Sequence, residues 1–446
     1  MRQLIAKVRG GVKVPHFKNT SESESVKMPA PPVVILPMCQ HIGAPCRPVA
    51  QVGDTVAVGQ VVGDTDAFVS APIHSPVSGT VKAISPCLIA EGVEVDAIHI
   101  ENDGRNTLYH AIKKPEINSR EDFLRAARDS GIVGLGGAGF PTHAKLTQKD
   151  GAKADTLVIN GAECEPYITS DYREMIENHV SILAGIQRVM ECLGIDTCLI
   201  GIESNKPKAI SLLADAITAR APRGRVSVVQ LPARYPYGAE KTLIRALTGR
   251  TVPLGGLPKD AGVVALNVST VAALNHYLET GLPLIQKRVT VAGGAIATAQ
   301  NLIVPIGAPI QDIVDFCGGF ARKPEKVIKG GPMMGTVQQD SRLQVTPIVK
   351  RDNAILCLTA DETYLPRAEP CIRCGFCVQA CPMKLMPAFI GRYAIRGNVR
   401  MLEKLKVSGC VECGSCAYVC PATRPLVQYI RQGKQAVEAT GTTQYA

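Results

Sequence analysis

Two cysteine runs near the carboxyl end of this chain carry its strongest chemical signal. Each run has the form C-x2-C-x2-C-x3-C-P, and together they hold Cys371, Cys374, Cys377, Cys381, Cys410, Cys413, Cys416 and Cys420. The first three thiolates of a run can ligate three irons of one 4Fe-4S cluster from a single tight loop. The fourth lies too far along the chain to join them. The spacing therefore predicts two 4Fe-4S clusters.

The fourth cysteine of each run is expected to ligate the other run's cluster. We therefore assign one cluster to Cys371, Cys374, Cys377 and Cys420, and the other to Cys410, Cys413, Cys416 and Cys381. Zinc is the first alternative, because paired cysteines also form tetrahedral sites. It has no use, however, for a third cysteine at the same spacing followed by Cys-Pro. Disulfides are the second alternative, and cysteines so crowded would strain them.

Size and composition indicate a globular chain of several domains. Its 446 residues are enough for about three or four domains, and 46% of them are hydrophobic. The net charge of +10 would suit anionic lipid, an acidic partner or nucleic acid. We expect no nucleic-acid partner, because the chain has no Trp and no basic run with interleaved aromatic residues.

The cysteines and the apolar runs also bear on the compartment. Clusters need reduced thiols, and the remaining cysteines show no paired spacing, so a reducing compartment is expected. No apolar run approaches the roughly 18 residues of a membrane span. The first residues lack the apolar core of a signal peptide. These features predict a soluble or peripheral protein.

The first 110 residues are expected to form an arm and a small β module. Residues 1–30 are mostly polar and predict a surface-lying or loosely packed arm. Short β-type runs broken by Gly and Pro follow from Val33 to about Ile100. Residues 52–81 resemble the barrel-sandwich fold of lipoyl and biotinyl carrier domains. Those carriers have a lysine in the hairpin that matches residues 66–69 here, which have none, so we expect the fold without the cofactor and a docking or scaffold role.

A glycine-rich loop follows a predicted helix at 120–130. It reads Gly134-Leu-Gly136-Gly137-Ala138-Gly139-Phe140. As a dinucleotide-binding fingerprint the match is weak, because such a loop should follow a strand. Four glycines in six positions nevertheless expose backbone N–H groups and allow close approach by an anion such as a flavin phosphate. The loop alone leaves a ligand cradle and a structural turn both open.

Strand-like and helix-like segments alternate through the middle of the chain and predict an α/β layered sheet. The expected strands are 156–160, 197–201, 226–230 and 262–267, and the expected helices lie near 172–192, 207–220, 239–248 and 270–279. Ligands of such sheets bind beyond the carboxyl ends of the strands. Polar groups follow three of these ends: Asn160 with Glu163 and Glu165, then Tyr235 with Gly238 and Glu240, then Asn267 with Thr270.

Each of these polar groups has a structural alternative. Asn160, Ser269 or Thr270 could cap helices, and Glu is favoured at helix N-termini. Three such groups together with a glycine-rich loop favour a flat, hydrogen-bonding cofactor instead. Beyond residue 283, strand-like runs around a helix at 310–316 look like a β-grasp module, and Met333 and Met334 are expected to be core residues. The cluster region should contain helices at 400–408 and 424–434.

The order of these parts resembles the C subunit of the Rnf (Rsx) ion-translocating electron-transport complex, over nearly the whole chain. The central region is also similar to the flavin-binding subunit of respiratory NADH:quinone oxidoreductase, whose G-x-G-G-A-G-F-P-T loop binds FMN and NADH. The resemblance implies four units: an arm and barrel-sandwich module (1–110), an α/β Rossmann-like FMN/NADH domain (111–283), a β-grasp module (284–360) and an α-helical, ferredoxin-type two-cluster domain (361–446).

The same resemblance implies roles for single residues. The residues expected around the flavin phosphate and nicotinamide are Gly134, Gly136, Gly137, Ala138, Gly139, Phe140 and Lys145. Those expected to contact the rest of the cofactor are Asn160, Tyr235, Gly238, Asn267 and Thr270. Glu163 and Glu165 match two glutamates of an N-A-D-E-S-E-P motif and, with Glu240, are candidate catalytic residues. Ala162 replaces the Asp of that motif, which removes one carboxylate from the site.

Family membership would explain why flavin and clusters share one chain. NADH gives up two electrons together, a cluster accepts one at a time, and a flavin can do both. The resemblance implies a peripheral subunit that exchanges electrons between NADH, FMN and two 4Fe-4S clusters. Its complex would couple electron transfer between ferredoxin and NAD(H) to Na+ or H+ translocation. The implied location is the cytoplasmic side of the cell (inner) membrane, with attachment through the other Rnf subunits.

Two other functions stay open at this point. A soluble cobalamin reductase would use similar flavin and cluster modules, but its barrel-sandwich module tends to follow the clusters, whereas here it precedes the flavin region. A non-catalytic cluster adapter would use the glycine-rich and glutamate motifs only for structure. Stoichiometric FMN and reduction by NADH would exclude the adapter.

Overall fold

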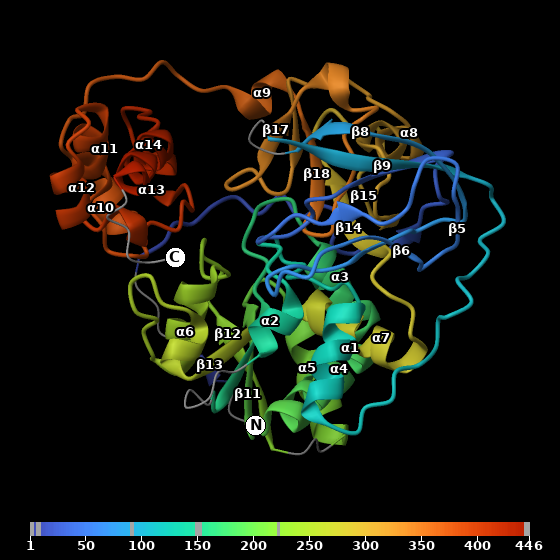
Figure 1. Ribbon diagram of the computed structural model, residues 1–446. Helices are drawn as coiled ribbons and strands as arrows, with labels where there is room; N and C mark the ends of the chain where they lie inside the picture. The colour runs from blue at the N-terminus through green and yellow to red at the C-terminus, as the bar shows by residue number, and fades with distance from the viewer. Residues whose placement is uncertain (1–3, 6–9, 90–92, 148–153, 221–223, 441–446) are drawn as a thin grey trace.

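The computed structural model describes residues 4–5, 10–89, 93–147, 154–220 and 224–440 (Figure 1). Its strands form four sheets, and its last helices form a separate bundle. The chain thus has the multidomain, mixed α/β composition that the sequence predicts. Among the helices that the structure describes, none combines the length and the hydropathy that a membrane crossing requires.

The first module consists of a four-stranded and a three-stranded antiparallel sheet. The larger sheet has the order β3-β9-β8-β5 and the smaller β4-β6-β7. The strands are β3 (Val33–Pro37), β4 (Arg47–Pro48), β5 (Thr55–Val56), β6 (Val61–Asp64), β7 (Ile73–His74), β8 (Gly79–Leu88) and β9 (Glu94–Asn102). Between β6 and β7, the Phe68 carbonyl accepts a hydrogen bond from His143 Nε2 at 2.9 Å, and the two rings meet edge to face. This hairpin therefore contacts the next unit.

The central unit is built on a parallel sheet with the order β1-β12-β11-β10-β13. Its strands are β1 (Leu4–Ile5), β10 (Thr156–Gly161), β11 (Thr197–Glu203), β12 (Arg225–Leu231) and β13 (Val263–Asn267). Its helices are α1 (Arg120–Asp129), α2 (Thr142–Leu146), α3 (Ser170–Glu177), α4 (His179–Leu193), α5 (Pro207–Arg220), α6 (Glu240–Thr248) and α7 (Val268–Thr280). The helix expected near 172–192 is in fact two helices that meet at Asn178, whose φ of −125° is not helical.

Alternate side chains of these strands enter two different cores, because neighbouring residues of a strand point to opposite faces. Leu157 and Ile159 pack in the large core with residues of α4, α5 and α7. Val158 packs on the other face with Leu243 and Ile244 of α6. The sheet is therefore covered on both faces, as parallel sheets require. The carboxyl ends of β10 and β13, which pair directly, remain at one edge of this layered unit.

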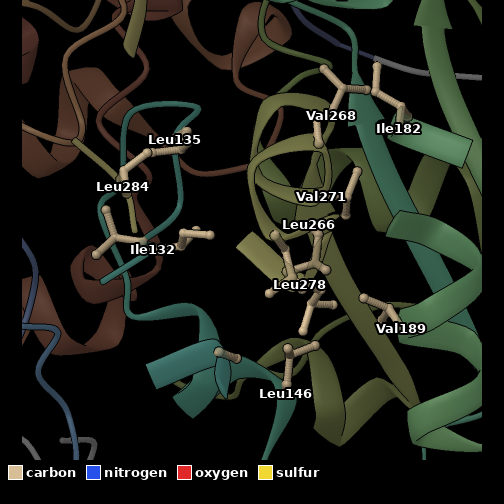
Figure 2. Close-up of a cluster of buried hydrophobic side chains, with 14 of the residues drawn as sticks. Ile132, Leu135, Leu146, Ile182, Val189, Leu266, Val268, Val271, Leu278 and Leu284 are labelled. Atoms are coloured by element: carbon tan, nitrogen blue, oxygen red, sulfur yellow. The ribbon is translucent and has the colours of Figure 1, made fainter. Parts of the chain in front are cut away.

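The glycine-rich loop is anchored in the large core. Figure 2 shows Ile132 and Leu135, on either side of the first glycine, near Leu284, with α2 and the β13–α7 segment close by. Leu135 is buried, and its backbone N–H donates to Thr270 Oγ1 at 3.0 Å. These contacts hold the start of the loop against the N-terminus of α7.

The third unit is a six-stranded mixed sheet with the order β17-β16-β18-β14-β15-β2. Five of its strands are β14 (Gln286–Ala292), β15 (Gln300–Pro305), β16 (Lys326–Lys329), β17 (Thr336–Gln338) and β18 (Ala354–Leu358), with helix α8 (Ile310–Phe316). The sixth, β2 (Val26–Lys27), comes from the N-terminal arm and pairs in parallel with Leu302 and Ile303.

The described part of the arm lies largely at the surface, as expected, but the expectation of loose packing is wrong. β1 pairs with β12, β2 pairs with β15, and Val12, Val14 and Met28 are buried. Thr20 is also buried, where its hydroxyl meets that of Thr169 at 2.6 Å. The arm shows no strand pattern in the sequence because its short pairings are made with two different sheets.

The carboxyl-terminal unit is a helical bundle reached by an extended linker. Its helices are α10 (Phe376–Ala380), α11 (Pro387–Ile395), α12 (Val399–Lys404), α13 (Ser415–Tyr418) and α14 (Leu426–Ala439), after the short helix α9 (Ala360–Thr363). Figure 1 shows the orange linker after α9 crossing to a red bundle that stands beside the main body. Gly391 of α11 and Gly433 of α14 permit close packing, since an added Cβ would meet neighbouring side chains at 3.3 Å and 3.1 Å.

Candidate active site and cluster sites

A cavity of about 610 Å³ opens at the carboxyl ends of β10 and β13. This volume is typical of cofactor sites, and the place is where α/β sheets bind ligands. The sequence-predicted residues that line it are Gly134, Gly136, Gly137, Ala138, Lys145, Asn160, Glu163, Glu165, Tyr235, Gly238, Glu240, Asn267 and Thr270. Gly139 and Phe140 are not among the lining residues.

Gly139 and Phe140 instead make backbone hydrogen bonds that close the glycine-rich loop. The Gly134 N–H donates to the Phe140 carbonyl at 2.8 Å, and the Gly139 N–H donates to the Gly134 carbonyl at 3.1 Å. The Gly139 carbonyl accepts from Ile42 of the first module at 3.0 Å. The exposed part of the loop is therefore 136–138, where Gly137 has a φ of +122° and open space around an added Cβ. This short stretch of backbone faces the cavity.

Asn267 is both a helix cap and a cavity residue. Its side-chain oxygen accepts from the N–H groups of Ser269 at 2.9 Å and Thr270 at 3.3 Å, and its amide donates to Asp171 at 2.7 Å. Asn160 donates to the Gly238 carbonyl at 2.8 Å. The cap of α7 is thus Asn267 rather than Ser269 or Thr270, and these hydrogen bonds hold the polar group in place beside the cavity.

Lys145 supplies a positive charge on the cavity wall. Its ammonium group pairs with Glu240 and donates to the Ala265 carbonyl at 3.0 Å. About a quarter of the Lys145 side chain is exposed. A partly exposed pair of this kind is weak in water, so an anionic ligand could compete with Glu240 for Lys145.

Glu163, whose side chain is 2% exposed, and the half-buried Glu165 lie on the cavity wall. Glu163 Oε1 accepts from the Asp171 N–H at 2.7 Å, and Glu165 Oε2 accepts from the Met333 N–H at 3.0 Å. Burial raises the pKa of both carboxyls, to about 7 for Glu165, although Lys18 opposes the shift at Glu163. The Lys18 ammonium group lies 3.8 Å from Glu163 Oε2, and the Tyr235 hydroxyl neighbours the Glu165 carboxyl. Buried carboxyls that line a cavity in this way fit a site built for a polar ligand.

Replacing Glu165 by Gln should change how stability depends on pH. The carboxyl has a pKa of about 7 when folded and an ordinary value of 4.5, so between these values the folded state holds more protons than the unfolded state. Folding stability contributed by this proton is lost as pH rises through 7. We expect the stability of Glu165→Gln relative to the native chain to rise by about 2 kcal/mol from pH 5 to pH 8. Urea unfolding at both pH values measures this, with the exposed Glu116→Gln as control. An equal difference at both pH values would contradict it.

Lys18 of the arm fixes the backbone that carries the two glutamates. Its ammonium group donates to the carbonyls of Glu163, Glu165 and Ile168, and it lies 3.8 Å from Glu163 Oε2. Only 11% of the Lys18 side chain is exposed, and burial lowers its pKa. The left-handed φ of +48° at Glu163 is therefore held by a cation from a distant part of the chain.

Lys18→Met should destabilise the protein by about 3 kcal/mol, because the carbonyls of Glu165 and Ile168 would lose the Lys18 donor and the Glu163 carboxyl would lose its neighbouring cation. Lys13→Met is the matched control, since Lys13 lies on the same arm and is exposed. It should change stability by less than about 0.5 kcal/mol. Thermal or urea unfolding distinguishes the two variants, and equal effects would refute the role given to Lys18.

The third unit contributes cavity residues that the sequence did not predict. They are Lys329, Gly330, Gly331, Met334, Gly335, Thr336, Gln338, Thr346, Pro347, Val349, Arg351, Asp352 and Asn353. Met334 is 51% exposed, so it is not the core residue that its type suggested, and Met333 is only half-buried. An added Cβ at Gly331 would lie 2.3 Å from Glu165 Oε2, so glycine is needed where this unit touches the glutamate. The glycines that flank Met333 and Met334 were the one feature of the sequence to indicate that this segment closely approaches another part of the chain.

Seven of the eight predicted cluster ligands fall into two groups in space. Cys381, Cys410, Cys413 and Cys416 line one small cavity. The thiol of Cys377 has Cys374 and Cys420 among its electrostatic neighbours. Each fourth cysteine thus lies with the other run. Four soft thiol donors around a common space fit an iron-sulfur cluster.

Among the described residues, no group of three or more His, Cys, Asp or Glu side chains has the arrangement of a site for a metal ion. Cluster thiolates stand farther apart than the ligands of one ion, because each binds a different iron.

Sequence models of protein families match four segments of the chain. They are a barrel sandwich hybrid domain of the RnfC type at 6–105, a Nuo51 FMN-binding domain at 127–276, an SLBB domain at 288–337 and a 4Fe-4S dicluster domain at 370–423. These matches support FMN and two 4Fe-4S clusters as the cofactors. Together with the cavity and the cysteine groups, they define an electron-transfer protein that joins a flavin site to a two-cluster module.

Full-length relatives identify the family. The chain is 44% identical to the C subunit of the proton-translocating ferredoxin:NAD(+) oxidoreductase complex of Clostridium ljungdahlii, over 99% of this chain and 96% of that protein. It is 43% identical to the C subunit of the Na(+)-translocating complex of Acetobacterium woodii, over 97% of each chain. The chain belongs to the family of C subunits of Rnf-type ion-translocating ferredoxin:NAD+ oxidoreductases. The resemblance seen in the sequence is thereby confirmed.

More distant similarities extend the picture. The C subunit of the ion-translocating oxidoreductase complex of Pseudomonas aeruginosa is 42% identical over 96% of this chain, which spans 55% of that protein. An NAD+-reducing [NiFe]-hydrogenase in the H2-reduced state aligns with 72% of this chain and 63% of its own at 18% identity, with a TM-score of 0.49. That structural likeness is too distant to bear on function.

Proposed function

We propose that this chain is the subunit through which NADH exchanges electrons with an ion-translocating ferredoxin:NAD+ oxidoreductase complex. The observation that carries the proposal is the cavity at β10 and β13, where residues far apart in the sequence meet beside the cluster unit. Val411, from the second cysteine run, lines this same cavity. Bound FMN would take a hydride from NADH and release its electrons singly, which suits clusters. The coupling to Na+ or H+ movement belongs to the complex as a whole.

The residues of the cavity would hold the cofactor in distinct ways. The exposed backbone at 136–138 and the Lys145 ammonium group would bind phosphate. Asn160, Asn267 and Thr270, each already fixed by hydrogen bonds, would orient the flavin from one side. Tyr235 and Gly238 would close the other side.

Glu163 and Glu165 would lie beside the bound nucleotide. Because burial raises their pKa values, Glu163 and Glu165 can hold a proton near neutral pH. In the protonated form they would not repel an anionic nucleotide, which offsets part of the cost of placing carboxyls there. Glu240, the ion-pair partner of Lys145, would partly neutralise the positive charge of the Lys145 ammonium group. These roles make the three glutamates candidate catalytic residues.

We further infer the finer organisation of the chain. Residues 1–110 would be the arm and barrel-sandwich module, 111–283 the Rossmann-like FMN/NADH domain, 284–360 the β-grasp module and 361–446 the ferredoxin-type cluster domain. The protein would bind the cytoplasmic side of the cell membrane through the other subunits of its complex, with ferredoxin as the second redox partner of that complex. The names of the Clostridium and Acetobacterium relatives support a place in a ferredoxin:NAD(+) oxidoreductase complex.

The test is NADH oxidation by the purified, anaerobic protein with ferricyanide as a one-electron acceptor. The expected result is FMN-dependent reduction of about two ferricyanide ions per NADH, because a hydride carries two electrons. Protein depleted of flavin should lose the activity and regain it with FMN. Flavin-loaded protein that ignores NADH would contradict the proposal.

A further inference from the structure

A second cavity, of about 350 Å³, lies beside the start of the glycine-rich loop. Leu135 and Lys287 line this second cavity and not the larger one, whereas Gly136 lines the larger one. Asp171 and Asn353 line both cavities. The peptide bond between Leu135 and Gly136 therefore lies in the wall that separates the two cavities.

Both backbone groups of Leu135 are held by side chains from other elements. Its N–H donates to Thr270 Oγ1 of α7 at 3.0 Å, and its carbonyl accepts from Lys287 Nζ of β14 at 2.7 Å. Lys287 is only 6% exposed, so this bond is largely shielded from water. The loop of the central unit is thus fastened by a lysine that the third unit supplies.

The bond to Lys287 determines where the next N–H points. A peptide bond that precedes a residue other than proline is almost always trans, and its N–H then points away from its carbonyl. Since the Leu135 carbonyl is directed at Lys287 and the second cavity, the Gly136 N–H is directed at the larger cavity. None of the backbone hydrogen bonds among the described residues uses the N–H groups of 136–138. These donors are therefore available to a ligand.

Lys287 can keep its charge at neutral pH. Burial lowers the pKa of Lys287 to about 8, and the carboxylates of Asp171, Asp352 and Glu174 oppose this shift. With a pKa of about 8 the side chain is mostly an ammonium group at pH 7. A charged donor makes a stronger hydrogen bond to a carbonyl than a neutral amine does. The Leu135–Gly136 peptide is therefore held firmly in one orientation.

We propose that Lys287 is a positioning residue for the flavin phosphate: by holding the Leu135 carbonyl, it aims the Gly136 N–H at the phosphate and gives the site its preference for FMN over riboflavin. The inference rests on the proposed function. Lys287 acts through the peptide and does not touch the cofactor. Without Lys287 the peptide is free to rotate, and the phosphate loses a donor. The ring system, which FMN shares with riboflavin, keeps its own contacts.

Titrations of the flavin-depleted, full-length protein test this role. Flavin fluorescence gives one dissociation constant for FMN and one for riboflavin. Their ratio reports recognition of the phosphate, because a general loosening of the loop weakens both ligands alike. In Lys287→Met the ratio of the riboflavin constant to the FMN constant should fall by about tenfold, as expected for one lost hydrogen bond to a charged group. Lys287→Arg keeps a charged donor and should restore much of the ratio. A native ratio in Lys287→Met would overturn the inference.

Lys350→Met is the matched control. Lys350 is another buried lysine of the third unit, and it donates to the carbonyls of Pro72 and Gly131 at 2.5 Å and 2.7 Å. It does not line the larger cavity. Its replacement should lower stability and leave the ratio unchanged.

If Lys287→Met does not fold, Lys287→Gln takes its place. The Gln amide keeps a polar group among the three carboxylates, but it is uncharged and one atom shorter than the lysine side chain. The same fall in the ratio is expected, and a native ratio would again overturn the inference.

The same titrations separate this inference from the proposed function. Native protein that binds neither flavin would contradict the proposed function. Native protein that binds FMN no more tightly than riboflavin would overturn the inference alone, because a flavin site would then exist without recognition of the phosphate.

Discussion

Cys420→Ser should remove or alter the cluster of Cys371, Cys374 and Cys377 and leave the cluster nearest to Cys420 in sequence intact. The reason is that the fourth cysteine of each run lies with the other run, as the neighbours of Cys377 and the cavity at Cys381 both indicate. Iron content should fall by about four per chain if the cluster is lost. EPR of the dithionite-reduced protein identifies which signal has changed.

The matched control for this variant is Cys192→Ser. Cys192 is a half-buried cysteine of α4 outside both runs, and its replacement should leave the iron content and both signals unchanged. Loss of the cluster of Cys410, Cys413 and Cys416 in Cys420→Ser would show that each run binds its own cluster. The exchanged ligand assignment would then be abandoned.

Gly136→Val should strongly reduce flavin binding while both clusters stay in place. A Cβ at Gly136 would lie 2.9 Å from Asn267 Nδ2, and Asn267 is held as the cap of α7. The added side chain would both displace this amide and enter the cavity that the loop lines. We expect the change to weaken flavin binding by about 2 kcal/mol. Because about 1.4 kcal/mol corresponds to a tenfold change in affinity, the flavin content should fall by about tenfold or more.

Flavin content by fluorescence after denaturation, and iron content, measure this prediction together. Gly104→Val serves as control, because Gly104 lies in the first module, where an added Cβ would meet nothing within 4 Å. It should keep both cofactors. Full flavin content in Gly136→Val would mean that the loop is a structural turn and that the flavin, if bound, lies elsewhere.

The sequence predicted best what depends on local spacing. The cysteine runs, the alternation of strands with helices and the polar residues at the strand ends need only a few neighbouring residues to be recognised. The glycine-rich loop was predicted as a unit, but the split between its cavity-facing part and Gly139 with Phe140 was not. That split depends on hydrogen bonds across the loop and to Ile42, which no local pattern shows.

Contacts between distant segments could not be predicted. Lys18 reads as an ordinary basic residue of a polar arm, yet it is held by carbonyls about 150 residues away. Met334 has the type of a core residue but is exposed at the cavity. In both cases the tertiary packing of another unit decides the environment, and the residue type alone does not.

The central claim is tested most directly by an anaerobic titration of the purified protein with NADH. Iron and FMN are quantified first, and about eight irons and one FMN per chain are expected. Flavin absorbance and cluster EPR are then followed in the same samples. The account predicts that NADH bleaches the flavin and that a cluster signal appears as electrons leave it. Eight irons with no flavin and no response to NADH would contradict the account, leaving a cluster-bearing adapter whose electrons enter through another subunit.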